Sequence, residues 1–313
     1  MKSSQIALVP FLILTCAHAD ILSQSSPFLG TSSPDFDPVE TTPETAMEQP
    51  AFAPFSPADS DIGIQQVLGS YDKLPPVQVT LDATLNYTNN APGVTRADDG
   101  ASWFFASSVA ASWRPLIAYG WFADVGVRGD VFYFEREEAV DFQNFQPYVG
   151  VVKSIPELDD LVYFARCEYQ RITGGSGPDG DYWAHRIRTG LRKDLLLTSR
   201  YQLAAGMAAG FDLAADDDQL ERNEYVLDVS YTYWFADHLS STLSWSGGYW
   251  DFRENSREDW NTLLGIELTW TPCPNARIYG NIYYTNHDSN TASDVNDYEA
   301  WQTGIGIGLN YSF

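Results

Sequence analysis

The sequence predicts an all-β protein: a transmembrane antiparallel up-and-down β-barrel of about twelve strands, behind a disordered N-terminal leader. Two observations support this fold class. Apolar and polar residues alternate within about a dozen segments of roughly ten to sixteen residues, and the connections between these segments are short and long in turn. Alternation with a period of two gives a strand one apolar face and one polar face.

The last segment shows the alternation most clearly. Trp301, Ile305 and Phe313 lie on one face, and small or polar residues such as Gln302 and Gly304 lie on the other. Aromatic residues stand at both ends of such segments, as expected where lipid surrounds a barrel with a polar interior. Residues 77–313 therefore resemble the bacterial outer-membrane β-barrel proteins, whose last residue is very often Phe. The resemblance lies in architecture and includes no catalytic motif.

The N-terminal part predicts export. Residues 1–19 read as a signal peptide, with Lys2 before an apolar core over 6–14 and a cleavage site after Ala19. Residues 20–76 hold nine of the seventeen prolines among Ser, Thr, Asp and Glu. Because such a segment has little apolar surface to offset its ordering entropy, we expect a flexible periplasmic segment, with a short helix conceivable only over 61–71. The sequence thus predicts a bacterial outer-membrane location.

Bulk composition excludes several classes of protein. The formal charge of −24 leaves no basic stripe for nucleic acid. After the signal peptide, no stretch approaches the roughly 18 apolar residues of a spanning helix. Cys167 and Cys273 fall on distant segments, so no disulfide is expected between them. Nothing in the sequence indicates a cofactor or a metal site.

Parity of the apolar residues places the strands. The predicted strands are 77–88, 101–114, 119–134, 143–154, 160–172, 182–194, 199–214, 223–236, 239–251, 259–271, 275–286 and 299–313. Large aromatics near the ends of the apolar faces predict a girdle at the membrane surfaces. Its members are Tyr87, Trp103, Trp113, Trp121, Trp183, Tyr225, Trp245, Trp260, Trp270, Trp301 and Phe313.

The connections predict an orientation. Short turns contain the prolines Pro115 and Pro272, whereas the longer loops are acidic or rich in glycine. All three lysines after the signal peptide, Lys73, Lys153 and Lys193, fall at the end with short turns, which is therefore the periplasmic end. The acidic outer loops could hold divalent cations that bridge lipid phosphates, but a solvated charge run explains them more simply.

The polar face predicts the lining of the lumen. Its basic residues form one predicted patch: Arg128, Arg166, Arg186, Arg188, Arg192 and Arg200. Its predicted acidic residues are Asp82, Asp124, Glu168 and Asp228. Opposed basic and acidic walls would orient polar solutes and favour anions slightly. The alternative is that the arginines pair with Glu168, Glu224 and Asp228 and hold a filled interior together.

Enzyme functions fit the sequence poorly. His238 and Ser240 imitate the His-x-Ser arrangement of outer-membrane phospholipases, but they fall in a predicted periplasmic turn. His185 is predicted to face lipid and His287 to lie at a loop, neither beside a carboxylate and a nucleophile. We therefore expect no enzyme.

The leading hypothesis is a porin-like channel for passive passage of small hydrophilic solutes. A second hypothesis is a non-conducting structural or surface-interaction barrel. A third hypothesis is an autotransporter-type barrel without a passenger domain, because residues 20–76 are too short and too rich in proline to form one. The expected partners are outer-membrane lipid and the barrel-assembly machinery, which would recognise the strand that ends at Phe313.

Overall fold

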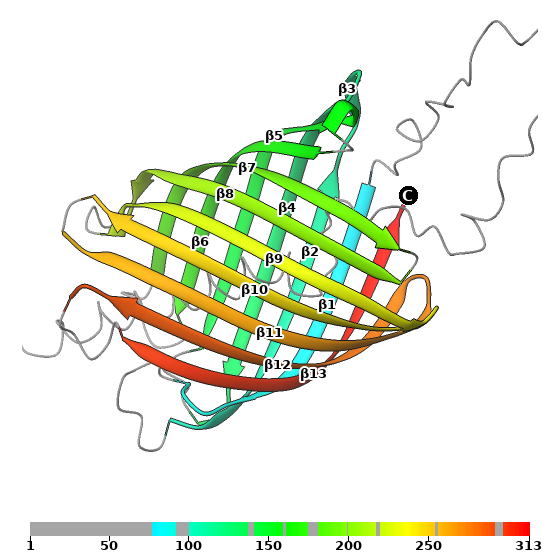
Figure 1. Cartoon of the computed structure of the whole chain (residues 1–313). Coiled ribbons are helices and arrows are strands. Elements are labelled where there is room, and N and C mark those ends of the chain that lie inside the picture. The colour runs from blue at the N-terminus through cyan, green and yellow to red at the C-terminus, as the bar shows by residue number, and fades with distance from the viewer. Residues whose placement is uncertain are drawn as a thin grey trace, which may run out of the picture.

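The computed structural model describes residues 77–91, 100–136, 141–158, 161–174, 181–198, 200–216, 220–253, 256–291 and 297–313. Twelve long strands close into one antiparallel barrel (Figure 1), which confirms the predicted fold class. The strands are β1 Val77–Thr88, β2 Ser102–Trp113, β3 Leu116–Ala118, β4 Trp121–Phe134, β5 Phe142–Ile155, β6 Leu161–Gly174, β7 Asp181–Thr198, β8 Tyr201–Ala215, β9 Arg222–Ala236, β10 Leu239–Phe252, β11 Glu258–Cys273, β12 Ala276–Ser289 and β13 Tyr298–Ser312. The predicted signal peptide and the 20–76 segment lie outside the described residues.

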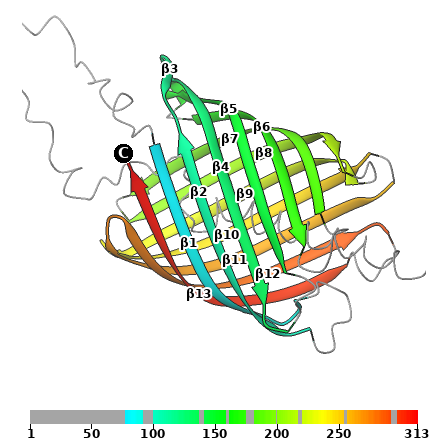
Figure 2. The ribbon, with the colours of Figure 1, turned by 180° about the vertical axis from the view of Figure 1, so that it is seen from behind.

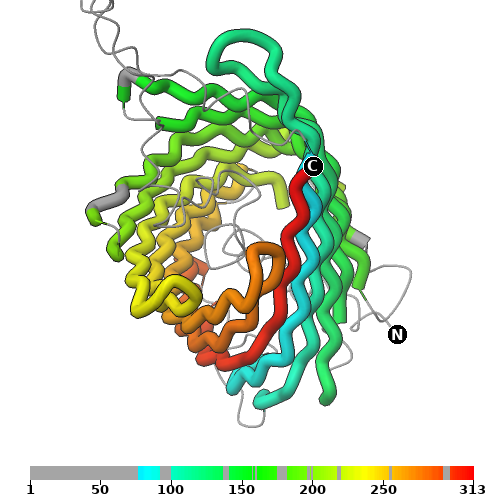
Figure 3. The backbone as a smooth tube through the Cα atoms, turned by 90° about the vertical axis from the view of Figure 1, so that its right-hand side faces the viewer, coloured from blue at the N-terminus to red at the C-terminus, as the bar shows by residue number. Residues whose placement is uncertain are grey.

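Closure of the barrel joins the first long strand to the last. β1 pairs with β2 on one side and with β13 on the other, in a register that sets Ala83 opposite Ile307. Val77 and Phe313 exchange backbone hydrogen bonds of 3.3 and 2.9 Å at the end of this seam. Figure 3 looks into the barrel and shows β13 beside β1 in an unbroken ring. Closure matters because it leaves neither strand with an unpaired edge.

Short and long connections alternate along the chain, as predicted. At the end where β1 begins and β13 finishes, β9 and β10 are joined through two residues, and β11 and β12 likewise. The β5–β6 connection at this end contains a short 3-10 helix, Pro156–Leu158. Longer connections lie at the opposite end, and several of their residues are outside the described part.

One short turn is more elaborate than predicted. The predicted strand 119–134 begins only at Trp121, because β3 folds back and pairs with the start of β4. Gly120 makes the reversal possible with a φ of 69°, a left-handed conformation that favours glycine. The β3 hairpin projects from the rim of the barrel (Figure 2).

The two faces of each strand differ in the predicted way. On β11, the outward Trp260 and Leu268 are 60% and 51% exposed, whereas the inward Asp259 and Glu267 are 0% and 5% exposed. Because large apolar side chains cover the outside and charged ones the inside, this arrangement is the reverse of a water-soluble protein. It is the pattern of a barrel surrounded by hydrocarbon.

Among the described residues, the structure contains no helix long and apolar enough to cross a membrane.

Candidate functional site

The inner wall holds nearly all the residues predicted to line a lumen. Those that lie inward, buried or half-buried, are Asp82, Asp124, Arg128, Arg166, Glu168, Arg186, Arg188, Arg192 and Asp228. Arg200 differs from the prediction: it lies exposed in the turn between β7 and β8, because β7 runs on to Thr198. The structure thus places the predicted residues of both charge signs on the inner wall, apart from this one arginine.

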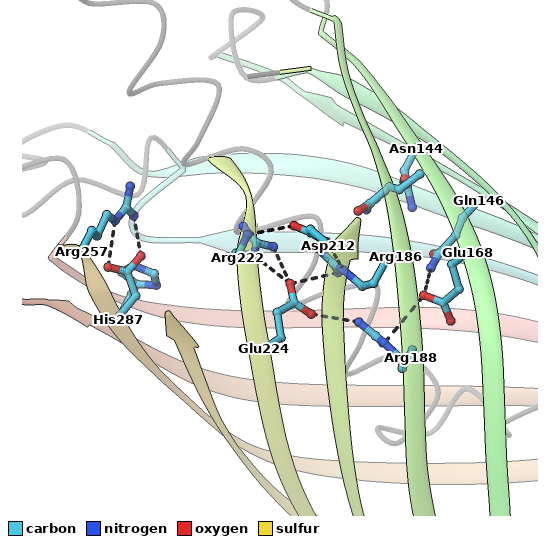
Figure 4. A network of polar contacts seen from close by, with 12 residues as sticks. Asn144, Gln146, Glu168, Arg186, Arg188, Asp212, Arg222, Glu224, Arg257 and His287 are labelled. Atoms are coloured by element: carbon cyan, nitrogen blue, oxygen red, sulfur yellow. Dashed lines mark hydrogen bonds and ion pairs between the residues drawn. The ribbon is translucent and has the colours of Figure 1, made fainter. Parts of the chain in front are cut away.

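Glu224 is the centre of a buried ion-pair network on β7, β8 and β9 (Figure 4). Its carboxylate lies 2.9 Å from Arg186 Nη1, 3.1 Å from Arg188 Nη2 and 2.7 Å from Arg222 Nη2. Asp212 accepts a hydrogen bond of 2.7 Å from Arg186. The network joins three adjacent strands through charges that water scarcely reaches.

Glu168 extends this network to β5 and β6. Its Oε2 lies 3.7 Å from Arg188 Nε and accepts a hydrogen bond of 3.1 Å from Gln146. The amide of Gln170 in turn donates to Asn144 across 3.3 Å. These polar contacts form a belt that crosses five strands in the half of the barrel next to the long loops.

A second cluster lies closer to the end of the barrel with the short turns. Asp124 is fully buried and accepts hydrogen bonds of 2.6 Å from Arg166 and 2.9 Å from Arg114. Arg128 lies 2.9 Å from Asp130, nearer the long loops, where Asn144 also donates a hydrogen bond of 3.0 Å to Asp130. Across the closing seam, Asp82 of β1 accepts a hydrogen bond of 2.9 Å from Arg277 of β12.

These contacts replace the predicted separation of charge. Arg166 was expected on a basic wall and Asp124 on an acidic one, yet they form an ion pair on one wall. Arg186 and Arg188 likewise form ion pairs with Glu224, and Arg188 also lies near Glu168. The alternative interpretation expected the arginines to pair with these two glutamates. The inner wall is therefore a mosaic of ion pairs rather than two fields of opposite sign.

Glycines on the inner wall receive large side chains from the neighbouring strand. Tyr148 of β5 lies over Gly126 of β4, and Tyr279 of β12 lies over Gly306 of β13. A Cβ at either glycine would collide with the ring. The two glycines thus let large aromatic side chains lie along the inner wall.

An apolar cluster lines one side of the lumen next to the long loops. Its aromatic residues are Phe104, Phe132, Phe134, Phe142 and Tyr182. Phe132 stacks on Phe142 with ring centroids 4.3 Å apart. Ala91 and Leu220 from two of the long connections pack into the same cluster. We refer to these residues as the outer aromatic cluster.

His287 is the main residue that the sequence interpretation misplaced. It lies on β12 rather than at a loop, it is 1% exposed, and its Nε2 is 3.2 Å from Asp259 Oδ2. The carboxylate of Asp259 is also held by Arg257 through a hydrogen bond of 2.9 Å. The imidazole stacks on Tyr298 with ring centroids 5.2 Å apart. The expected loop position of His287 was wrong, because β12 extends further than its parity suggested and so sets the imidazole beside the carboxylate of Asp259.

This arrangement suits a structural role better than catalysis. Arg257 and His287 both contact Asp259, so the carboxylate is already engaged by two partners. Asn261 Oδ1 contacts the other ring nitrogen of His287. The cluster fastens the connection before β11 to β12.

The predicted girdle residues lie on the outer face. Trp103, Trp113, Tyr225 and Trp301 are among those exposed to between 44% and 54%, and Phe313 reaches 71%. Trp121 and Trp183 are half-buried, and Lys153 Nζ lies 4.9 Å from the Trp121 ring centroid. Cys167 and Cys273 are free thiols with exposed side chains.

Metal ligands do not assemble within the described ranges: no three His, Cys, Asp or Glu side chains come together as a metal site. Several acidic loop residues, such as Asp217 and Asp294, lie outside those ranges, so the prediction of divalent cations at the loops stays a prediction.

Comparison with known proteins gives matches in structure only. No protein-family model matches the chain, and no curated protein matches it in sequence. An outer-membrane channel from Pseudomonas putida F1 is 7% identical, with a TM-score of 0.52 over 76% of this chain and 96% of that one. The NanC porin is 13% identical over 73% of this chain and 98% of that one, with a TM-score of 0.42. A KdgM porin solved with disordered oligogalacturonate is 13% identical over 75% and 99%, with a TM-score of 0.39.

At 7% identity, the likeness to the Pseudomonas channel concerns the fold alone. The chain has the architecture of the bacterial outer-membrane β-barrel proteins.

Proposed function

We propose that the protein is an outer-membrane channel for passive passage of small hydrophilic solutes. One observation carries the proposal: a closed barrel is apolar outside and charged inside, and several of its largest inward side chains lie along the wall over glycines. Side chains that lie along a wall obstruct the axis less than side chains that point across it. An aqueous path through the middle fits this geometry.

Strand number is consistent with a narrow channel. Barrels of about eight strands are filled by their own side chains, and those of about sixteen to eighteen leave a wide aqueous pore. Twelve strands fall between these limits. We therefore expect a narrow pore through which only small solutes and ions pass.

The ion pairs change the expected selectivity. An anion preference would need arginines whose charge is not balanced locally, but Arg166, Arg186 and Arg188 each contact a carboxylate. A neutralised arginine still donates hydrogen bonds to polar solutes through its remaining N–H groups. The inner wall is therefore suited to hydrophilic solutes without a strong preference for anions.

Planar-bilayer recording tests the proposal. The purified chain, with and without residues 20–72, is reconstituted in KCl, and the current steps are measured. Stable steps in either form support a channel. The absence of current in both forms, from preparations whose heat-modifiable mobility shows a folded barrel, would overturn it.

A second candidate function, a non-conducting barrel for structural or surface interaction, is favoured by the outer aromatic cluster. Leu220 and Ala91 bring residues of two long connections into that cluster, at the end of the lumen where solutes would enter. The two-form recording separates the candidates directly.

The route to the membrane belongs to the same proposal. A signal peptide over 1–19, cleaved after Ala19, would direct export, and β13 with Phe313 would be recognised by the barrel-assembly machinery. The exposed apolar face, which includes Ile305 and Ile307, supports lipid as the main partner.

A further inference from the structure

β8 separates a row of arginines on β7 from a row of carboxylates on β9. Its inward side chains are short, and Gly206 and Gly210 lie among them. Each of these two glycines has an arginine opposite it on β7 and a carboxylate opposite it on β9. The wall thus repeats one arrangement at two heights.

At Gly210 the arrangement is bridged. Arg188 and Glu224 are the register partners of Gly210, and their side chains meet in an ion pair of 3.1 Å. Arg186 also reaches Glu224, at 2.9 Å. The two charged rows are joined over this glycine.

At Gly206 the same arrangement is not bridged. Arg192 and Asp228 are its register partners, but Arg192 contacts Asp194, 3.2 Å away on its own strand. Asp228 makes no hydrogen bond or ion pair with any residue that the structure describes, although it is only 6% exposed. Its two carboxylate oxygens lie over Gly206, 2.8 and 2.9 Å from the position that a Cβ would take.

The charge around Asp228 is negative. Arg192 and Asp194 both act on its carboxylate, with opposite signs, and they form an ion pair with each other. Because Arg192 and Asp194 neutralise each other in this ion pair, the three side chains together carry one net negative charge when Asp228 is ionised. A buried carboxylate without a partner is unfavourable, so this position gains from a cation that none of the described residues supplies.

The surroundings of Asp228 suit a primary ammonium group. Ser246 of β10 is the register partner of Asp228, and β8 contributes Ala204, Gly206 and Ala208 to the inward face. An ammonium group has three N–H donors, which a carboxylate and a neighbouring hydroxyl can accept. The inward side chains of β8 next to this carboxylate are short, so they place little bulk around a small bound group.

We propose that Asp228, over Gly206, is a subsite for the ammonium group of a small cationic solute in the lumen. The inference rests on the proposed channel, whose substrates it narrows to solutes that carry a primary amine. The proposed subsite gives the middle of the wall formed by β8, β9 and β10 a role in selecting solutes.

Putrescine, a primary diamine, is the probe for this subsite. In bilayers of the full-length chain we expect putrescine to reduce the KCl current in a concentration-dependent manner. Asp228→Asn should raise the half-blocking concentration roughly tenfold or more, since a charge-assisted hydrogen bond is lost. Asp251→Asn removes one charge from the outward face of β10 and should leave the block unchanged. Equal block of the native chain and Asp228→Asn would overturn the proposal.

A binding measurement separates this proposal from the channel itself. Calorimetric titration of putrescine into the detergent-solubilised chain needs no current. Binding that Asp228→Asn abolishes would support the subsite even if the barrel did not conduct. Equal heats for the native chain and Asp228→Asn, or no heat with the native chain, would reject it. Removal of an unpartnered charge should also leave Asp228→Asn at least as resistant to urea as the native chain, which guards against a folding artefact.

Discussion

Replacing Glu224 by Gln should destabilise the barrel strongly. Glu224 is 1% exposed, and it neutralises Arg186, Arg188 and Arg222 at distances between 2.7 and 3.1 Å. Gln has nearly the same shape but carries no charge. The substitution therefore leaves three guanidinium groups close together, while Asp212 still contacts Arg186 and Glu168 still contacts Arg188.

The size of the effect follows from the network. One ion pair at 4 Å is worth about 4 kcal/mol at an effective dielectric constant near 20. Desolvation of the buried ions offsets much of that gain, but removing one partner from a buried network costs about 3–5 kcal/mol in unfolding free energy. We expect Glu224→Gln to lie in this range.

Urea unfolding in detergent, followed by tryptophan fluorescence, measures the change. Glu221→Gln is the matched control, because Glu221 lies 3.7 Å from Arg253 and both side chains are more exposed. Such a surface pair contributes about 0–1 kcal/mol. A difference below about 1 kcal/mol between the two variants would refute the reasoning, since it would mean that lumen water already screens the arginines.

Three further variants probe the rest of the architecture. Gly126→Leu should lower the unfolding free energy by about 1–3 kcal/mol, because the leucine side chain would displace the Tyr148 ring from the wall. Urea unfolding measures the change, and Gly129→Leu on the outer face is the control. Ile307→Arg, at an outward position 57% exposed, should cost about 2–4 kcal/mol in a bilayer if it lies near the midplane, whereas Asp237→Arg in an exposed turn should cost little. Deletion of Phe313 removes two backbone hydrogen bonds and should lower the stability of the barrel in vitro. If the assembly machinery recognises Phe313, the deletion should cause a larger relative loss of folded barrel from outer-membrane fractions. Equal losses in both assays would argue against such recognition.

Strand positions were predictable because lipid on one side and polar groups on the other enforce a period of two. β10, predicted over 239–251, runs over Leu239–Phe252, and β1 has the predicted bounds. The prediction was less accurate where the alternation fails. Consecutive leucines at 195–197 remove the parity signal, so the end of β7 at Thr198 could not be placed.

Partners across the wall were not predictable from one sequence. Arg277 and Asp82 are 195 residues apart, and they meet only because closure sets β13 between β12 and β1. Arg166 reaches Asp124 across β5 in the same way. A list of strands gives the order of neighbouring strands but not their register. Without the register, neither the ion pairs nor the contacts between tyrosine rings and glycines can be predicted.

Labelling of two adjacent cysteines on β1 tests the central claim, that lipid covers the outer face and water reaches the inner one. Ala83 faces outward opposite Ile307, whereas Thr84 faces inward opposite Gly306. Each is changed to Cys in a chain whose native cysteines are Ser, and the barrel is reconstituted in liposomes with a small charged thiol reagent. We predict rapid labelling of Thr84→Cys and protection of Ala83→Cys. Equal labelling of both, or faster labelling of Ala83→Cys, would contradict the account.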